Sequence, residues 1–523
     1  MNKLILGISA LLIGQMVFAQ NEDDALRYSQ TYFGGTARNS GMAGAMTAFG
    51  GDFSVVTQNP AGLARIRKTN FSTTLNIENV SSNSDFYGNS NKDRGTIGNL
   101  GNLSYVKAYE LDPKLNNNWY SVQLGMGMTR IKSFQQRIDY TGTADSSILH
   151  SFINEASGTP DSLIYDYHPF TGGLAYDVFA IDPAPGNEYV TDFTSGKSIH
   201  NRSITRKGGM SEYSFSLSGN YANKLYLGGS FNMTRVNYEE SFEHKETFTD
   251  TSLWLQSINY TGTLDINGWG YSMRLGAIFL PVEWVSIGVS AQLPTIYNLS
   301  DSWSNNMTST TDDGDKFVGA EFIPSGAYDY RVTTPFRGNL SLGVVLEKFG
   351  SIGMEVEYVD YSSASLKSKR YSESPYGFVS ENFQIENIYK SALNYKIGAE
   401  ARINSQLYLR GGFALYESPF KEGKGNAQYP TTFYTGGVGY NWGSVYVDAA
   451  VVVQQSKADY YAYDPTINGS KATINENTFE GGEGKNTQIV LGKDLFIKGF
   501  DKQIIGVKKD DEKVVKINLP DNF

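Results

Sequence analysis

The sequence predicts an all-β fold: a transmembrane antiparallel β-barrel of about fourteen strands with a small N-terminal hatch in its lumen. Three observations predict it. Apolar and polar residues alternate in short segments from residue 70 almost to the end of the chain, which is the period of a half-buried strand. The connections between these segments alternate between short and long. Glycine (55) and tyrosine (35) are abundant while only 19% of residues are charged, as is typical of strands that face lipid and lumen on alternate sides.

Fourteen segments show the alternation. In residues 120–129, for example, Tyr120, Val122 and Leu124 alternate with small or polar residues. The expected strands are 71–77, 103–109, 120–129, 213–221, 225–233, 269–279, 285–291, 336–346, 352–358, 393–401, 407–415, 434–440, 445–453 and a short last one at 487–491. An even number suits a bacterial single-chain barrel, and in lipid only a closed barrel satisfies every strand hydrogen bond. A soluble secreted β-protein is the alternative that alternation alone allows.

The connections predict how the barrel is oriented. Short turns are expected at 222–224, around Pro281, at 348–350, at 404–405 and at 441–443. The long connections, of about 27 to about 80 residues, are expected at 131–210, 239–265, 293–334, 362–390 and 454–484. Short turns face the periplasm and long loops face outward in outer-membrane barrels, so both termini are expected in the periplasm.

The chain divides into four expected parts. Residues 1–19 read as a cleaved signal peptide, because Lys3 is followed by an apolar stretch that ends in the small residue Ala19. Residues 20–69 are expected to form the hatch and residues 70–496 the barrel. Residues 497–523 are expected to form a periplasmic tail or the end of the last strand.

Composition excludes several classes of function. The absence of cysteine excludes a lipoprotein, a disulfide scaffold and a thiolate metal site. A net charge of −10 without a basic patch argues against nucleic acid as a partner. No G-x-S-x-G, H-E-x-x-H or P-loop motif is present, so we expect no enzymatic activity and no cofactor.

The hatch segment differs from the rest of the chain because its residues do not alternate. Small residues, including Gly41 and Gly44, are concentrated in residues 34–46, and they allow close packing or sharp bends of the backbone. Asn59-Pro60-Ala61-Gly62 is a turn signal directly before the first strand. A compact segment of this kind is expected to fold back into the lumen, with a disordered periplasmic tail as the alternative.

Four short motifs in this segment resemble a known family. Gly35-Thr36-Ala37-Arg38, Gly41-Met42-Ala43-Gly44-Ala45, Gly50-Gly51-Asp52 and Asn59-Pro60-Ala61-Gly62-Leu63 look like the N-terminal hatch of FadL/TodX-type outer-membrane transporters of long-chain fatty acids, in the form common among Bacteroidetes. The motif-bearing match covers residues 23–78. One departure lies at the C-terminus, where the family usually ends on an aromatic residue. Phe496 could have that role here, but residues 497–523 follow it.

The resemblance implies passive transport of hydrophobic, fatty-acid-like molecules through a hatch-gated barrel in the outer membrane. The hatch residues it implicates are Asn59, Pro60, Ala61, Gly62, Gly41 and Gly44. The implied partners are the hydrophobic ligand and the lipid and lipopolysaccharide of the outer membrane. Three alternatives remain open: a binding component of a secretion or surface assembly, uptake of haem or aromatic compounds, and a barrel-embedded hydrolase.

Candidate binding residues are few at this level. His150, His168, His200 and His244 fall in the expected long loops without ligand spacing, so solvated side chains are expected rather than metal or haem ligands. Asp312-Asp313-Gly314-Asp315 lacks the full ligand set of a calcium loop. Aromatic residues at strand ends are expected to form interfacial girdles. The aromatic loop residues that are candidates for ligand contact are Phe134, Phe152, Phe170 and Trp303.

Overall fold

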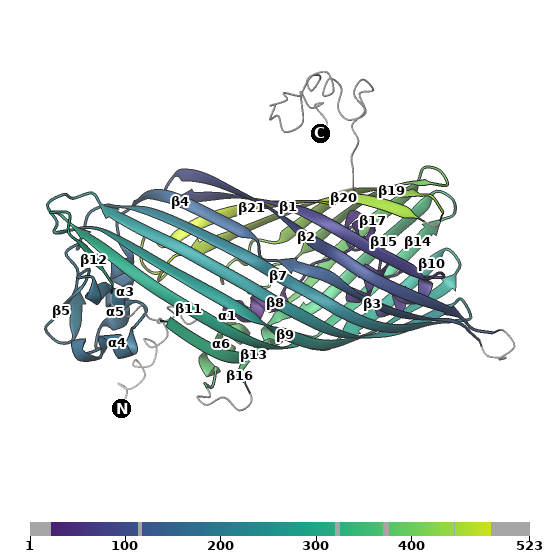
Figure 1. Ribbon diagram of the computed structural model, residues 1–523, viewed down its shortest axis with the longest axis horizontal. Helices are drawn as coiled ribbons and strands as arrows, with labels where there is room; N and C mark the ends of the chain where they lie inside the picture. Colours follow the sequence, from purple (N-terminus) through teal and green to yellow (C-terminus); the bar gives the residue numbers. More distant parts are fainter. Residues whose placement is uncertain (1–21, 113–117, 320–324, 370–375, 444, 483–523) are drawn as a thin grey trace, which may run out of the picture. The chain divides into compact units, whose positions relative to one another are not determined.

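The computed structural model describes residues 22–112, 118–319, 325–369, 376–443 and 445–482. Fourteen antiparallel passes of the chain form one closed barrel (Figure 1), which confirms the predicted fold class. The chain divides into two compact units at residue 482, and the second unit lies outside the described residues. None of the helices in the described ranges is long and apolar enough to cross a membrane.

Each pass pairs with the next one along the chain, and the last pass pairs with the first. Four passes are interrupted and consist of two strands each. In order, the strands are β1 (Asn70–Phe86), β2 (Asn89–Glu110), β3 (Trp119–Ser133) with β4 (Gln136–Ala144), β7 (Ser198–Tyr221), β8 (Leu225–Phe248), β9 (Leu255–Val282), β10 (Val285–Gln292) with β11 (Ile296–Thr311), β13 (Ser325–Thr333) with β14 (Arg337–Leu346), β15 (Gly350–Asp360) with β16 (Ser365–Ser368), β17 (Ser391–Arg402), β18 (Leu407–Tyr416), β19 (Thr431–Asn441), β20 (Tyr446–Tyr461) and β21 (Lys471–Gly482).

The two ends of the barrel differ. At one end, here named the turn end, short turns join neighbouring strands at 222–224, 283–284, 347–349 and 403–406, and between β19 and β20 the Trp442 amide donates to the Val445 carbonyl (2.8 Å). The short turns are therefore confirmed, except that Pro281 lies inside β9 and the turn follows at 283–284. At the other end, here named the loop end, Figure 1 shows the small elements α3 (Ile148–Ala156), α4 (Ile164–Tyr167), α5 (Gly172–Asp177), β5 (Asp182–Ala184) and β12 (Lys316–Val318). β6 (Glu188–Val190) pairs with β5.

The strands reach further toward the loop end than the sequence predicted. β7 begins at Ser198 and β8 continues to Phe248, so much of the expected loops at 131–210 and 239–265 is strand. The outward residues there are polar: Glu243 and Lys245 are exposed, while His244 between them is buried. Charged outward side chains of this kind suit water and not lipid. Burial therefore still alternates along these strands, but the alternation of apolar and polar residues on which the prediction depended is lost.

The closing strand also differs from the prediction. The expected strand at 487–491 lies outside the described residues. The strand that pairs with both β20 and β1 is β21, within the stretch 454–484 that was predicted to be a loop. Its pairing with β1 runs from Thr473 to Gly482, which faces Asn76. Closer to the turn end, the Asn70 side chain donates a hydrogen bond to the Tyr446 hydroxyl (2.9 Å) and so links β1 to β20.

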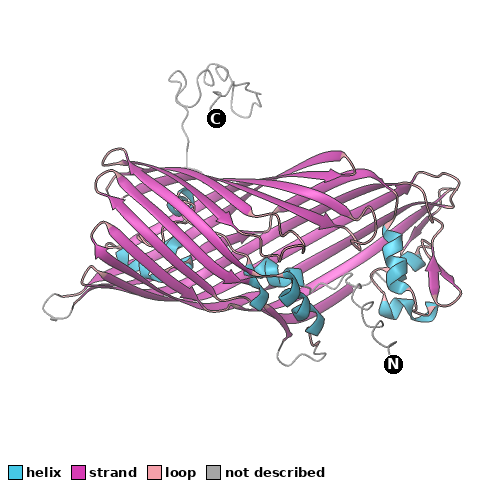
Figure 2. Cartoon of the chain, turned by 180° about the vertical axis from the view of Figure 1, so that it is seen from behind, coloured by secondary structure: helices cyan, strands magenta, loops and turns pink. Residues whose placement is uncertain are grey.

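The N-terminal segment lies within the barrel. Its helical elements are α1 (Glu22–Ser29), α2 (Ala37–Gly41), η1 (Phe53–Thr57) and η2 (Pro60–Arg65), and Figure 2 shows helical turns enclosed by the strands. On the outer surface, large apolar side chains such as Leu217 and Leu275 remain exposed. An apolar exterior is what a lipid-embedded barrel requires.

Candidate functional site

Residues 22–69, named the hatch from here on, fill part of the lumen. Ala25 and Tyr28 of α1 are buried in an apolar group of wall and loop residues. We name this group the lumen cluster; besides α1 it includes Ile131, Phe134, Tyr238, Tyr297, Tyr330, Val332, Tyr361 and Tyr389. The rings of Tyr28 and Phe134 pack in a T-shaped arrangement, with centroids 6.3 Å apart. The candidate ligand residue Phe134 therefore lines the lumen, whereas Phe152 belongs to a separate cluster at the loop end.

Local sequence explains the helical turns of the hatch. The Thr36 side chain caps α2 by accepting a hydrogen bond from the Asn39 amide (3.2 Å), and its hydroxyl donates to Asp52 (2.7 Å). Asn59 caps η2 by accepting from the Ala61 amide (3.1 Å), with Pro60 at the first helical position. Asn at the cap followed by Pro is favoured because both residues suit the start of a helix.

The Asn59-Pro60-Ala61 motif attaches the hatch to the wall. The Asn59 amide donates to the carbonyl of Thr47 within the hatch (3.2 Å) and to the carbonyl of Ala277 on β9 (3.4 Å). The Ser218 hydroxyl on β7 donates to the Pro60 carbonyl (2.7 Å). The predicted hatch motif thus forms polar contacts with two strands, in addition to capping its own helix.

Wall glycines let the hatch backbone approach the strands closely. A Cβ at Gly353 would overlap the Ala45 carbonyl, and one at Gly412 would lie 2.7 Å from the Met42 carbonyl carbon. Seven of the wall glycines at which an added Cβ would meet the hatch are named the glycine belt: Gly228, Gly276, Gly288, Gly343, Gly353, Gly398 and Gly412. Within it, Gly343, Gly353, Gly398 and Gly412 are successive cross-strand partners on β14, β15, β17 and β18. Sequence reasoning missed this belt, although lumen-facing glycines in neighbouring hairpins were a visible signal.

The remaining predicted hatch residues have two different roles. The Gly41 carbonyl accepts a hydrogen bond from the Thr435 hydroxyl on β19 (3.0 Å), so Gly41 contacts the wall. Gly44 and Gly62 shape the hatch itself. Gly44 has φ +74° and a Cβ there would lie 2.5 Å from the Cβ of Phe33, while the Gly62 carbonyl accepts from the Gly51 amide (2.9 Å). The structure therefore gathers Asn59, Pro60 and Gly41 at the hatch–wall boundary and leaves Gly44 and Gly62 inside the hatch.

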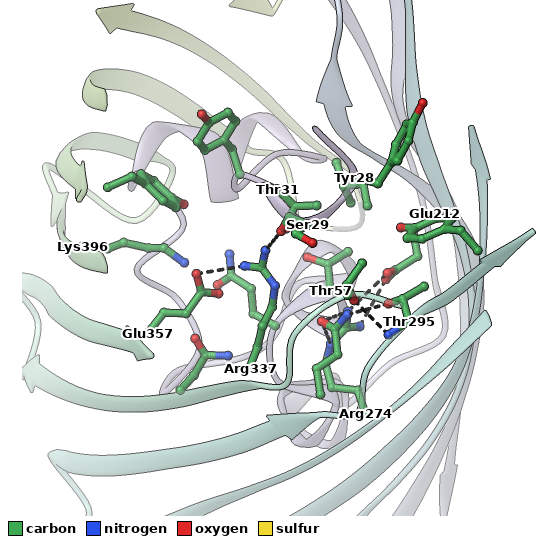
Figure 3. Close-up of a pocket in the computed structure, with 18 residues that line it drawn as sticks. Tyr28, Ser29, Thr31, Thr57, Glu212, Arg274, Thr295, Arg337, Glu357 and Lys396 are labelled. Atoms are coloured by element: carbon green, nitrogen blue, oxygen red, sulfur yellow. Dashed lines mark hydrogen bonds and ion pairs between the residues drawn. The ribbon is translucent and has the colours of Figure 1, made fainter. Parts of the chain in front are cut away.

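Buried wall cations hold hatch carbonyls, and Figure 3 shows the contact of Arg337 with Ser29. Arg274 on β9 donates to the Val56 carbonyl (2.9 Å) and pairs with Glu212 on β7 (3.1 Å). Arg337 on β14 donates to the Ser29 carbonyl and pairs with Glu357 (3.1 Å). These charges were not predicted, because nothing in the alternation of a single strand shows which lumen-facing charges will meet a partner.

In another ion pair the cation belongs to the hatch and the carboxylate to the wall. The Arg38 guanidinium donates twice to the Glu400 carboxylate at 3.3 Å, and Arg410 on β18 donates to the same carboxylate (2.7 Å). Burial disfavours the charge on Arg38, but the nearby Glu400 and Asp52 outweigh it and raise the pKa of Arg38 above its ordinary value. Arg38 therefore stays charged within the lumen.

The space between hatch and wall is small and polar. The cavity in Figure 3 measures about 30 Å³, which is room for roughly one water molecule. Its charged lining consists of Arg274, Arg337, Lys396, Glu212 and Glu357. This cavity is far too small for a lipid-sized molecule.

Beside the hatch, the neighbouring wall strands β2 and β3 separate from each other. Pairing between β2 and β3 ends at Asn102 and Thr129. Beyond that point β4 pairs with β7, and among the described strands residues 89–101 of β2 pair with β1 alone. The parted segment of β3 bends toward the hatch, where the Tyr32 amide donates to the Ile131 carbonyl (3.3 Å). A cavity of about 90 Å³ lies at this place, between the hatch, Asn99 and the inner side of β3.

Comparison with solved structures supports the fold. The chain is similar to a FadL homologue from Pseudomonas aeruginosa, with a TM-score of 0.52 and 14% identity over 87% of this chain and 98% of that chain. It is also similar to the toluene transporter TodX of P. putida, with a TM-score of 0.48 and 12% identity over 86% and 97% of the two chains.

A different similarity covers the C-terminal residues. Residues 466–523 match the FKBP-type peptidyl-prolyl cis-trans isomerase family. The chain is 72% identical to trigger factor of Pelagibacter ubique over 53 residues, and 38% identical to trigger factor of Bartonella bacilliformis over 65 residues. These matches cover 10% and 11% of this chain, and the chain spans only 11% and 14% of the length of those two relatives. The matched stretch includes β21.

The two similarities thus concern different parts of the chain. The isomerase-like match is confined to the last residues, whereas the structural match extends over most of the sequence. In agreement with the resemblance found in its N-terminal motifs, the chain has the barrel fold of the Pseudomonas aeruginosa FadL homologue.

Proposed function

We propose that this protein is a passive transporter of hydrophobic small molecules in the outer membrane of a Gram-negative bacterium. The loop end faces outward in this proposal, and both termini lie in the periplasm. The observation that most directly supports this proposal is that β3 separates from β2 beside the hatch. The fold shared with a FadL homologue supports the same function.

The path begins at the loop end. A hydrophobic molecule enters the lumen and reaches the lumen cluster, which α1 now occupies with Ala25 and Tyr28. Displacement of the hatch exposes this apolar surface and widens the space beside Asn99. The molecule then leaves sideways between β2 and β3, into the membrane. The free energy comes from consumption of the molecule downstream, because the hatch is far smaller than the plug domain of a 22-stranded transporter.

The substrate class we propose is fatty-acid-like. Three cations line the cavity beside the hatch, Arg274, Arg337 and Lys396, and each has a buried carboxylate partner, Glu212, Glu357 and Glu355 respectively. These cations supply charged donors for an anionic head group. The neighbouring lumen cluster offers apolar surface for a tail, and burial of each methylene in such a site contributes about 0.8 kcal/mol.

We propose no enzymatic activity for the chain, despite the isomerase-like similarity. Residues 471–482 belong to that stretch, yet they form β21 and pair with both β20 and β1. The same residues cannot form this barrel strand and pack into a separate isomerase domain at the same time.

Uptake of labelled oleate by cells that lack the gene tests the transport proposal. The gene is restored either unchanged or with Asn59→Ala and Pro60→Ala together. We expect the unchanged gene to restore uptake, and the hatch variant to alter the rate because the Asn59 hydrogen bonds to Thr47 and Ala277 and its cap on η2 are lost. If the unchanged gene restores uptake of neither oleate nor smaller aromatic compounds, the transport proposal is wrong.

A further inference from the structure

Two histidines and a glutamate meet near the loop end of the barrel. His200 lies on β7, and His244 and Glu246 lie on β8. In the register of these strands His200 is directly opposite Glu246, and all three side chains are completely buried. The prediction that His200 and His244 are solvated loop residues is therefore wrong; both lie on strands that continue beyond the lipid-facing part of the wall.

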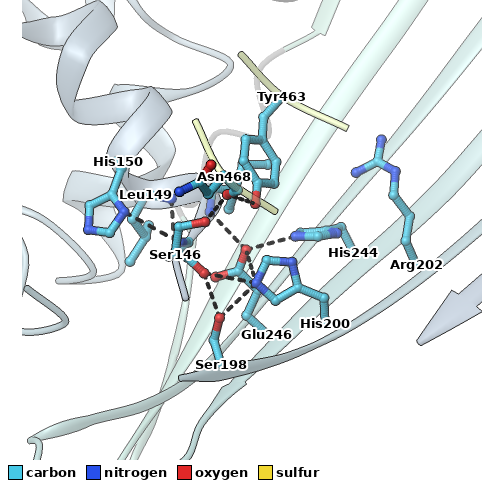
Figure 4. A network of polar contacts seen from close by, with 12 residues as sticks. Ser146, Leu149, His150, Ser198, His200, Arg202, His244, Glu246, Tyr463 and Asn468 are labelled. Carbon is cyan, nitrogen blue, oxygen red and sulfur yellow. Dashed lines mark hydrogen bonds and ion pairs between the residues drawn. The ribbon is translucent and has the colours of Figure 1, made fainter. Parts of the chain in front are cut away.

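The donor atoms of the three side chains converge, as Figure 4 shows. The Glu246 carboxylate oxygen Oε1 lies 2.9 Å from His244 Nε2 and 3.6 Å from His200 Nε2. One donor atom from each residue lies within 4.8 Å of the other two. Tetrahedral zinc with bonds of 2.0–2.1 Å places its ligand atoms about 3.3 Å apart. The observed separations bracket this spacing, so small side-chain adjustments would create the site.

The polar atoms in this cluster are incompletely satisfied. In the described part of the chain, both Nδ1 atoms and the second carboxylate oxygen of Glu246 have no hydrogen-bond partner. Among the described residues, the ion-pair partners of Glu246 are the two histidines. The nearby Arg202 guanidinium does not pair with Glu246 but donates to the Tyr460 hydroxyl (3.1 Å). Burial of a carboxylate without a strong cation is costly. A bound divalent ion would supply the missing positive charge.

We propose that His200, His244 and Glu246 bind a divalent transition-metal ion of the zinc class. Two imidazoles and one carboxylate are a recurrent ligand set for such ions. The Ser146 carbonyl, 3.0 Å from His200 Nε2, and the Ser198 hydroxyl, 2.7 Å from it, are the neighbouring oxygen donors for a further position. This site is independent of the proposed transport function.

The ion would connect the wall to the structures that cover the loop end. The amide of Ile148, the first residue of α3, donates to Glu246 Oε1 (2.8 Å). From the connection between β20 and β21, the Tyr463 ring lies 6.2 Å from the His244 ring. The metal would therefore hold β7, β8 and the start of α3 in one arrangement, and its removal would loosen the loop end.

Cobalt titration of the purified full-length barrel tests the site, because tetrahedral Co²⁺ with nitrogen and oxygen ligands gives visible d–d absorption. We expect one ion per chain, displaced by Zn²⁺, and at least a tenfold weaker affinity in Glu246→Gln and in His244→Asn. His168→Asn is the matched control: His168 also faces a carboxylate, Glu155 at 3.3 Å, but lies outside the cluster. This control should bind like the unchanged protein.

Heat-modifiable migration on gels shows whether each variant is folded. The proposal is overturned if the folded, unchanged protein binds no Co²⁺ or Zn²⁺, and this measurement does not depend on any variant. It is also overturned if folded Glu246→Gln and His244→Asn bind as tightly as His168→Asn. A second readout is the unfolding temperature, which we expect Zn²⁺ to raise in the unchanged protein and in His168→Asn but in neither cluster variant.

Discussion

Asn59 of the hatch and Gly276 of β9 are in direct contact, and the contact depends on the absence of a side chain at Gly276. A Cβ at this glycine would overlap Asn59 Oδ1 and lie 3.1 Å from Pro60 Cδ. The Asn59 amide meanwhile donates to the carbonyl of the next wall residue, Ala277. The hatch motif therefore packs directly against the glycine belt. The wall glycine leaves the space, and the hatch forms the polar contacts.

Gly276→Ala is expected to weaken the contact between the hatch and β9. The added methyl group requires a shift of the hatch, and overpacking of this kind costs about 1–3 kcal/mol. We expect a higher conductance in planar lipid bilayers, because a displaced hatch opens the lumen to ions. Gly436→Ala is the control, since a Cβ at Gly436 meets nothing within 4 Å. Equal conductance of the two variants would contradict the role of Gly276.

A disulfide between hatch and wall is expected to block transport. A Cβ built on Gly41 lies 3.7 Å from the Cβ of Ala450 on β20, which is within the range of disulfides. The chain contains no cysteine, so Gly41→Cys with Ala450→Cys introduces a single pair. We expect oxidised cells to lose at least nine-tenths of oleate uptake and to recover it with a reductant, because a tethered hatch cannot move.

The control for this tether places both cysteines in the wall. Val438 and Ala449 are cross-strand partners on β19 and β20, so Val438→Cys with Ala449→Cys adds a disulfide that leaves the hatch untethered. Its uptake should be the same with and without reductant. If the Gly41–Ala450 tether forms and uptake is unchanged, the hatch does not gate the path.

Arg274 is expected to stabilise the barrel mainly through its pair with Glu212. Arg274→Met would leave Glu212 buried without its cation, which costs about 3–5 kcal/mol. Adding Glu212→Gln removes the unpaired buried charge. The free energy of unfolding, measured with urea, should therefore be almost as high in the double variant as in the unchanged protein. The hydrogen bond to the Val56 carbonyl remains absent in both variants. Equal stability of the single and double variants would show that the ion pair contributes little.

Alternation predicted the lipid-facing part of the wall because lipid imposes a strict rule on outward residues. Leu217 and Leu275 point outward and remain exposed, and the alternation around them was visible in the sequence. Beyond the lipid, outward residues such as Glu243 and Lys245 obey no such rule. The strand ends, the closing strand β21 and the shorter loops were therefore not predictable from hydropathy.

The candidate site was predicted only as far as local sequence determines it. Asn59 and Pro60 form a cap and a turn within a few residues, so their part in the hatch could be read directly. Gly353 and Ala45 are far apart in sequence, and their contact depends on how the hatch docks. His200 and Glu246 meet through the register of a long hairpin. Neither relationship has a signature in a single stretch of residues.

Removal of residues 483–523 is expected to leave an assembled barrel. β21 ends at Gly482, and the residues after it belong to a separate compact unit. A chain that ends at Gly482 should therefore keep heat-modifiable migration. A chain that ends at Asp464 lacks β21, which leaves β1 and β20 with unpaired edges toward lipid, and it should not assemble because such edges are costly there.

The same chains decide whether the isomerase-like stretch is an enzyme. We expect the full-length protein to isomerise a proline-containing peptide no faster than the uncatalysed reaction, which takes tens of seconds or longer at 25 °C, because residues 471–482 are committed to the barrel wall. The chain that ends at Gly482 provides the background rate. Faster isomerisation by the full-length protein, together with assembly of the chain that ends at Asp464, would show that the stretch folds as part of an isomerase and that β21 is dispensable for the barrel.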